Sequence, residues 1–216
     1  TRYIAMEKTM TSPQTPLSLA LSKRKSEERA TPITAFRMAR SWWLEGRRLN
    51  LSQLAEELGI GRATLMRWVG NKDLLMGEIL WSLYKRIYDE AIARAEQTPG
   101  LEGIDFLTQI YEDINIALIN ARPMYDFLQA EPQWGLQLLT ARSSGLQERL
   151  INTWQKMFEE AIAAKQIKPE MDPQSLALYI VRIGESAIYC DLICGRKPEP
   201  GPASTAFRLL VNGHQN

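Results

Sequence analysis

The sequence predicts an all-α protein. Apolar residues recur at helical spacing along most of the 216-residue chain, and no stretch shows the convincing alternation of apolar and polar residues that indicates a β-strand. Glycines and prolines divide the chain into segments of helical length. A charged fraction of 24% and a hydrophobic fraction of 45% are ordinary for a globular protein, so a packed helical core is expected.

The composition also indicates where the protein works. No apolar run approaches the roughly 18 residues that suggest a membrane span. No secretory signal pattern opens the chain, and its two cysteines do not make a disulfide framework. We therefore expect a soluble, cytoplasmic protein with no membrane partner.

The first part of the chain predicts a tail and four helices. Residues 1–30 combine two prolines with a basic run and scattered polar residues, which predicts a flexible basic tail. Each expected helix starts at or after a residue suited to the N-cap or the first turn, and these residues are Thr31, Asn50, Gly61 and Asn71. Gly46 marks the end of the first helix, and a Thr-Pro-Gly sequence stops the fourth at about Gln97.

The second part predicts six further helical segments. They lie at 101–121, 123–129, 132–141, 144–165, 174–194 and 203–211. The segment 174–194 is apolar on nearly every face, and a helix of that kind must be buried on both sides. One face can pack on the chain's own core and the other on a second subunit, which predicts a homodimer. A simple central core helix is the alternative.

The stretch from Leu51 to Met76 has the pattern of two short helices joined by a tight turn, followed by the start of a third helix. Four apolar residues are spaced to form a small shared core: Leu54, Leu58, Ile60 and Leu65. Gly59 lies where the first short helix must end with a residue that tolerates a positive φ. Such a unit has no room for a catalytic pocket, but it can present its second helix to a DNA groove.

The charge distribution favours the same interpretation. Residues 1–72 carry 13 Lys and Arg against 6 Asp and Glu, a net charge of +7. Residues 73–216 carry 13 against 19, a net charge of −6, so the overall value of +1 conceals an asymmetry. The basic part contains the two short helices, where a surface that binds a polyanion needs its positive charge. A merely solvated basic tail is the alternative.

The chain resembles the TetR family of transcriptional regulators in four features. They are the first helix, the pair Leu54-Ala55 followed by Gly59-Ile60, the pair Thr64-Leu65, and the run from Asn71 to Leu75. The resemblance implies a helix-turn-helix DNA-binding domain, here residues 31–76, followed by a helical ligand-binding and dimerisation domain, here residues 77–216. It also implies a homodimer on a palindromic DNA operator, formed through the helix near 174–194 and the last helix.

The second short helix, from Arg62 to Trp68, is expected to lie in the major groove. Arg62 and Arg67 can recognise guanine, and Lys72 combines its charge with the start of a helix to bind phosphate. The expected DNA-binding set is Arg62, Ala63, Thr64, Met66, Arg67, Trp68 and Lys72. Met66 stands where the family commonly has tyrosine and cannot donate a hydrogen bond to phosphate. Trp68 can stack on a sugar or pack in the domain core, and both alternatives stay open.

Aromatic and polar residues in the apolar helices of the second region are the candidates for a small-molecule cavity. The expected ligand-binding set is Trp81, Tyr84, Tyr88, Phe106, Tyr111, Tyr125, Trp134, Asn152, Phe158, Arg182, Glu185 and Tyr189. Asn115 is another polar residue in apolar helical context. Packing in the structural core is the alternative for the aromatic residues. Arg182 and Glu185, three residues apart, can equally satisfy each other.

The resemblance implies a ligand-responsive regulator, with repression as the expected outcome. Effector binding then changes the separation of the two recognition helices and releases DNA. We expect a small, largely apolar effector with one polar head, such as an acyl compound or a lactone. The alternative from another class is an all-helical enzyme that binds a small molecule and carries an incidental three-helix bundle.

The cysteines and the histidine give little support to catalysis. Cys190 and Cys194 share a helix face without a histidine, so buried small hydrophobic side chains are favoured over a metal or redox pair. His214 is the only histidine and lies near the end of the chain. We therefore expect no catalytic residue, no metal site and no cofactor.

Overall fold

The computed structural model describes residues 30–212 and confirms the all-α class, because every regular element in that range is helical. The helices are α2 (Pro32–Leu44), α3 (Leu51–Glu57), α4 (Arg62–Val69), α5 (Lys72–Glu96), α6 (Gly103–Ile119), α7 (Arg122–Ala130), α8 (Pro132–Thr140), the 3₁₀ turn η1 (Arg142–Ser144), α9 (Leu146–Ala163), α10 (Pro173–Ile188), α11 (Cys190–Cys194) and α12 (Pro200–Asn212). The expected basic tail, apart from its last residue, and His214 lie outside the described residues.

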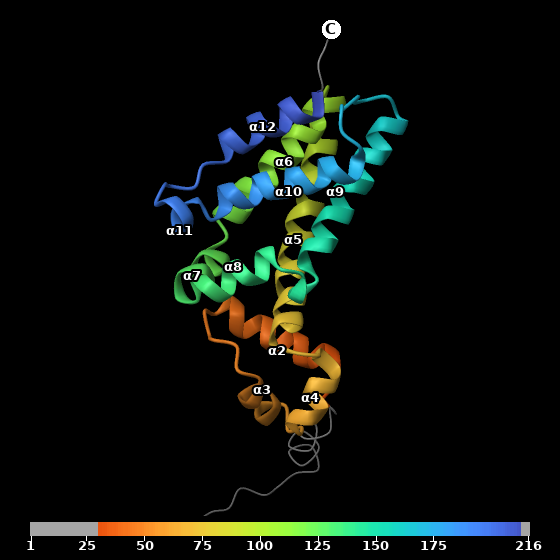
Figure 1. The fold of residues 1–216 in the computed structure, drawn as a ribbon. Helices are drawn as coiled ribbons and strands as arrows, with labels where there is room; N and C mark the ends of the chain where they lie inside the picture. The colour runs from red at the N-terminus through yellow and green to blue at the C-terminus, as the bar shows by residue number, and fades with distance from the viewer. Residues whose placement is uncertain (1–29, 213–216) are drawn as a thin grey trace, which may run out of the picture.

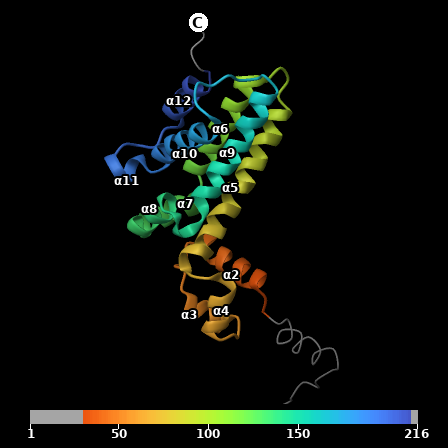
Figure 2. The same cartoon turned by 45° about the vertical axis from the view of Figure 1, so that its right-hand side comes forward.

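The long helix α5 connects the two ends of the molecule (Figure 1). Helices α2, α3 and α4 gather around its first turns at one end. At the other end α6 and α9 pack along α5, and α10 and α12 pack on α6, on α9 and on each other, as the turned view in Figure 2 also shows. The short helices α7 and α8 lie between the two groups. In the described part of the chain, no helix has the length and apolar content needed to cross a membrane.

Side-chain caps set the starts of the first helices. The backbone N–H of Thr34 donates to Thr31 Oγ1 (3.2 Å), and that of Leu74 donates to Asn71 Oδ1 (2.8 Å). Asn50 accepts from the backbone of Ser52 at 2.9 Å, which confirms it as the N-cap of α3. These caps explain why the expected helix starts agree with the observed ones.

The core of the helix-turn-helix unit forms from the expected residues. Leu54 and Leu65 are fully buried, whereas Leu58 and Ile60 are half-buried at its edge. Gly59 has a φ of +65°, so the turn after α3 uses the left-handed region that favours glycine. Full burial of a leucine contributes about 1.5–3 kcal/mol. These contacts hold α4 against α3 and fix the direction of its outer face.

The segment expected to be one helix over 174–194 is two helices. Helix α10 ends at Ile188, and Tyr189 has the non-helical dihedral angles φ −114° and ψ 26°. The side chain of Tyr189 is buried. In α11, by contrast, Cys194 is exposed and Cys190 is half-buried. The expectation of two buried cysteines is therefore wrong, because the chain turns at Tyr189 and carries α11 toward the surface.

Candidate functional site

The outer face of α4 presents a basic surface. Arg62, Ala63 and Arg67 are exposed, while Leu65 on the opposite face is buried in the core. Among the described residues, neither arginine has an ion-pair partner. Both guanidinium groups can therefore contact a polyanion without breaking an internal ion pair.

The other expected DNA-binding residues of α4 are less accessible. Thr64, Met66 and Trp68 are half-buried. Trp68 packs against the core and lines a shallow groove with Phe36 of α2 and Leu74 of α5. This placement gives Trp68 a role in packing α4 against the rest of the unit.

Lys72 does not point freely away from the molecule. Its Nζ atom lies 3.6 Å from Glu131 Oε2 and 3.6 Å from the ring centroid of Trp134. The indole N–H of Trp134 donates to Asp73 Oδ1 at 2.8 Å, and Arg48 forms an ion pair with Glu131. We call Glu131 and Trp134 the α7–α8 corner. This corner joins the two short helices to the start of α5.

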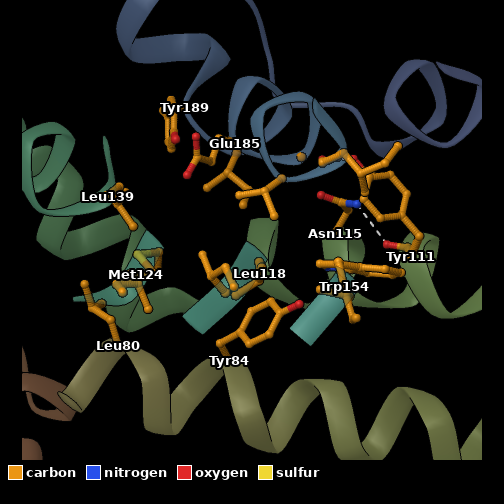
Figure 3. Close-up of a pocket in the computed structure, with 17 residues that line it drawn as sticks. Leu80, Tyr84, Tyr111, Asn115, Leu118, Met124, Leu139, Trp154, Glu185 and Tyr189 are labelled. Atoms are coloured by element: carbon orange, nitrogen blue, oxygen red, sulfur yellow. Dashed lines mark hydrogen bonds between the residues drawn. The ribbon is translucent and has the colours of Figure 1, made fainter. Parts of the chain in front are cut away.

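A cavity lies inside the second group of helices (Figure 3). Seventeen residues line it: Leu80, Tyr84, Tyr111, Ile114, Asn115, Leu118, Met124, Leu139, Leu146, Leu150, Trp154, Ile180, Val181, Gly184, Glu185, Ile188 and Tyr189. Its free volume is about 60 Å³. The walls come from α5, α6, α7, α8, α9 and α10, together with Tyr189 beyond the end of α10, so the cavity is at the centre of this helical group.

The structure brings four members of the expected ligand-binding set to this cavity: Tyr84, Tyr111, Glu185 and Tyr189. It places the other eight elsewhere, and these are Trp81, Tyr88, Phe106, Tyr125, Trp134, Asn152, Phe158 and Arg182. Phe158 is fully buried in the aromatic core, and Asn152 and Tyr125 are exposed. Helical periodicity gives the same signal for a core position and a cavity wall, so it did not separate these two groups.

Most of the lining residues outside the expected set are aliphatic. These side chains look like ordinary core in the sequence, which explains why they were missed. Asn115 and Gly184 are different. A methyl group at Gly184 would lie 3.1 Å from Asn115 Oδ1, so glycine permits the close approach of α10 and α6 beside the cavity. A polar residue in an otherwise apolar helix is unusual, and this feature of the sequence could have identified Asn115 as a cavity residue.

Glu185 is the charged group of the cavity wall, and two residues outside the cavity hold its carboxylate. Its Oε2 atom accepts a hydrogen bond from Arg182 (2.8 Å), and its Oε1 atom accepts one from the side chain of Gln147. Burial raises the pKa of Glu185, and the hydrogen bonds with Gln147 and the charge of Arg182 act against that rise. The alternative that Arg182 and Glu185 satisfy each other is thus what the structure shows.

Two tyrosines of the cavity have unsatisfied hydroxyl groups. The buried hydroxyls of Tyr84 and Tyr189 have no hydrogen-bond partner within the described range. Tyr111 differs, because its hydroxyl donates to the backbone carbonyl of Ile180 at 3.0 Å. Burial raises the pKa of all three tyrosines, so each keeps its proton at neutral pH. A ligand atom that accepts a hydrogen bond could satisfy Tyr84 or Tyr189.

Cys190 and Cys194 lie apart from this cavity, on α11, with their sulfur atoms 3.4 Å apart. In the described part of the chain, no group of three or more His, Cys, Asp or Glu side chains is arranged to hold a metal ion. The cavity therefore offers a ligand one carboxylate, a few hydroxyl and amide groups, and an apolar wall.

A helix-turn-helix unit with an exposed basic helix, joined by a long helix to an all-helical group with an internal cavity, defines a class of DNA-binding transcriptional regulators. Residues 102–212 match the family model described as "Tetracyclin repressor-like, C-terminal domain". The chain belongs to the TetR family and is a transcriptional regulator, not an enzyme. No curated protein matches the sequence.

The fold agrees with a solved structure of the same family. The structure is that of the R. erythropolis transcriptional repressor QsdR, from the TetR family, and it superposes with a TM-score of 0.75 at 27% sequence identity. The match covers 86% of this chain and 96% of QsdR. Both the helix-turn-helix unit and the larger helical group therefore belong to one known architecture.

Proposed function

We propose that the protein is a ligand-responsive transcriptional repressor. In this proposal residues 31–76 bind a palindromic DNA operator, and residues 77–216 form a homodimer and hold a small, largely apolar effector such as an acyl compound or a lactone. The observation that carries the proposal is that α7 and α8 both line the cavity, while the corner between them, at Glu131 and Trp134, contacts the start of α5. Repression is favoured because QsdR, which shares the fold, is described as a repressor.

The basic face of α4 supports DNA binding. Arg62 and Arg67 extend from one helix whose opposite side is anchored by Leu65, so the helix can enter the major groove as a rigid unit. Arginine can form two hydrogen bonds with guanine, which provides sequence readout. Lys72 can reach a phosphate after it leaves Glu131.

Exposed apolar side chains on α10 and α12 support a homodimer. Leu178 and Tyr179 are exposed on α10, and Leu209 is 73% exposed on α12. The opposite face of α10 is buried in the chain's own core, as a doubly apolar helix requires. Both helices lie at the same side of the molecule (Figure 1). A two-fold dimer through this face presents two recognition helices to the two halves of a palindrome.

The small size of the cavity supports a structural response to the effector. A cavity of roughly 150 Å³ can hold benzene, whereas the free volume here is only about 60 Å³. A ligand with an acyl chain must therefore move the walls apart as it enters. Such a ligand prefers the expanded arrangement and shifts the equilibrium toward it.

The α7–α8 corner provides a path from the cavity to the DNA-binding helices. Met124 of α7 and Leu139 of α8 line the cavity, and the same two helices meet at Glu131 and Trp134. A second hollow of about 210 Å³ beside Trp134 leaves the corner room to move. Displacement of the corner changes its contacts with Lys72, Asp73 and Arg48, and thereby the position of α4.

The test is a DNA selection followed by titration. The full chain is used to enrich binding sequences from random duplexes, and the affinity for the enriched duplex is measured by fluorescence anisotropy at several salt concentrations. The proposal predicts a palindromic sequence, two chains per duplex and an affinity that falls steeply as salt rises. Enrichment of no sequence, or binding without salt dependence, would contradict it.

A further inference from the structure

The wall of the cavity carries one acidic side chain and no basic one. Glu185 is the only charged side chain among its lining residues, and none of them is lysine, arginine or histidine. Glu185 is also the only charged residue among the buried residues of the described chain, with 6% of its surface exposed. Any ligand in the cavity therefore lies against a carboxylate and meets no cation that could compensate a negative charge.

The partners of Glu185 approach it from outside the cavity. Arg182 and Gln147 hold the two carboxylate oxygens, but neither residue lines the cavity. The side chain of Arg182 is 42% exposed, so its charge is partly hydrated on the solvent side of α10. Water screens an exposed charge, and the arginine is poorly placed to attract an anion on the other side of the carboxylate.

The hydroxyl group of Tyr84 defines what the ligand must offer. Tyr84 and Tyr189 both line the cavity, and the Tyr84 hydroxyl has no acceptor in the described residues, whereas the Tyr189 hydroxyl lies beside the Glu185 carboxylate. Figure 3 shows Tyr189 beside Glu185, with Tyr84 across the cavity on α5. The Tyr84 hydroxyl can donate a hydrogen bond to an oxygen acceptor of the ligand, and a carbonyl oxygen supplies that acceptor without a charge.

We infer that the cavity selects an uncharged acyl head group, an amide or ester, and rejects the corresponding free carboxylate. This inference rests on the proposed effector site and names the chemistry of its ligand. A neutral carbonyl can satisfy the Tyr84 hydroxyl at no electrostatic cost. A carboxylate would lose its hydration and lie near a second negative charge, and both effects oppose its binding. Glu185 thus provides specificity by repulsion.

Three ligands with the same eight-carbon chain test the inference: octanamide, octanoate and octylamine. Their dissociation constants for the full chain are measured at neutral pH by isothermal titration calorimetry. We expect octanamide to bind at least about tenfold more tightly than octanoate, because one unscreened like charge has an effect of this order. We expect octylamine to bind more weakly than octanamide, because both oxygens of Glu185 already have donors.

The substitution Glu185→Gln removes the charge and keeps the shape of the side chain. It should reduce the preference for octanamide over octanoate to less than about threefold, mainly through tighter binding of octanoate. The matched control is Glu96→Gln, at an exposed position near the end of α5, which should leave the preference unchanged. Circular dichroism spectra of both variants verify that the helical fold is retained.

The outcomes separate this inference from the proposed function. Equal affinity of octanamide and octanoate in the wild-type protein would overturn the charge selection while leaving an effector cavity in place. Tighter binding of octylamine than octanamide would overturn it as well, because Glu185 would then recruit a cation. Failure of all three ligands to bind would reject the cavity as the site of an acyl effector, and the proposed effector site would fail with the inference.

Discussion

At the scale of single residues, two environments distinguish the charged side chains of this protein. Arg62 and Arg67 are exposed on α4 and have no ion-pair partner within residues 30–212. Glu185 is buried between helices and held by two donors. The exposed arginines are available for a charged partner, whereas the buried carboxylate determines which ligands can lie beside it.

Replacement of Arg67 by alanine should weaken operator binding without affecting the fold. The residue is exposed and forms no ion pair among the described residues, so the main loss falls on DNA recognition and is roughly 1–3 kcal/mol. Anisotropy titration with the enriched duplex measures the change, and thermal unfolding verifies stability. Arg86→Ala, at an exposed position on α5, serves as the control. Unchanged affinity of the Arg67 variant would remove this residue from the recognition surface.

The buried carboxylate predicts a pH effect on stability. Burial raises the pKa of Glu185 above its ordinary value of 4.5, so the folded protein holds this proton more tightly than the unfolded chain does. The contribution of Glu185 to the free energy of unfolding therefore falls as the pH rises through its folded pKa. Relative to Glu185→Gln, the wild-type protein should lose stability as the pH rises above about 4.5 and through the raised pKa of Glu185. Denaturant unfolding at several pH values measures the difference, and parallel curves for the two proteins would contradict it.

At the scale of elements, the α7–α8 corner connects cavity and DNA-binding unit through a small number of polar contacts. Glu131 holds Lys72 and Arg48, and Trp134 holds Asp73. In this arrangement Lys72 is engaged with the corner rather than with solvent. If Lys72 contacts DNA as proposed, a phosphate must compete with Glu131 for the same ammonium group.

Replacement of Glu131 by glutamine should strengthen operator binding. The variant releases Lys72 and Arg48 from a carboxylate that is 15% exposed, and we expect an affinity gain of about threefold to tenfold at low salt. The slope of log affinity against log salt should become steeper by about one, which corresponds to one additional phosphate contact. The same titration with Glu96→Gln provides the control. An unchanged affinity and an unchanged slope would show that Lys72 does not exchange between the corner and DNA.

The exposed apolar face of α10 and α12 predicts the effect of a charge at the dimer surface. Tyr179 is 53% exposed and points away from the chain's own core, so Tyr179→Glu should leave the monomer folded and disrupt association. Sedimentation velocity should show a dimer for the wild-type protein and a monomer for the variant. Ala93→Glu, on the exposed surface of α5, is the control and should remain dimeric. A dimer that survives the Tyr179 substitution would place the interface elsewhere.

The elements were largely predictable from the sequence because their signals are local. Thr31, Asn50 and Asn71 cap the helices that the sequence assigned to them. The break between α10 and α11 was not predictable, because it occurs in a continuous apolar segment without glycine or proline at the break. The tertiary contacts of the buried Tyr189 ring, rather than a local breaker, accompany the change of direction there.

At the scale of the whole molecule, the class of protein was predictable and the cavity was predictable only in part. The helix-turn-helix pattern is short and specific, whereas a cavity wall combines residues from helices far apart in the chain. Tyr84 and Glu185 were expected at the site, but Leu139 and Met124 have the same periodic pattern as any core residue. Which side chains face an internal hollow depends on how the helices pack, and no local pattern contains that information.

The proposed regulator requires that the cavity and the DNA-binding helices are coupled. The direct test is the affinity of the full chain for its enriched duplex, measured by fluorescence anisotropy with and without saturating octanamide. The account predicts that octanamide lowers DNA affinity by at least about tenfold, since coupling free energies are typically 1–3 kcal/mol. By thermodynamic linkage, operator DNA should weaken octanamide binding by the same factor. DNA affinity that stays the same while octanamide is bound would contradict the account.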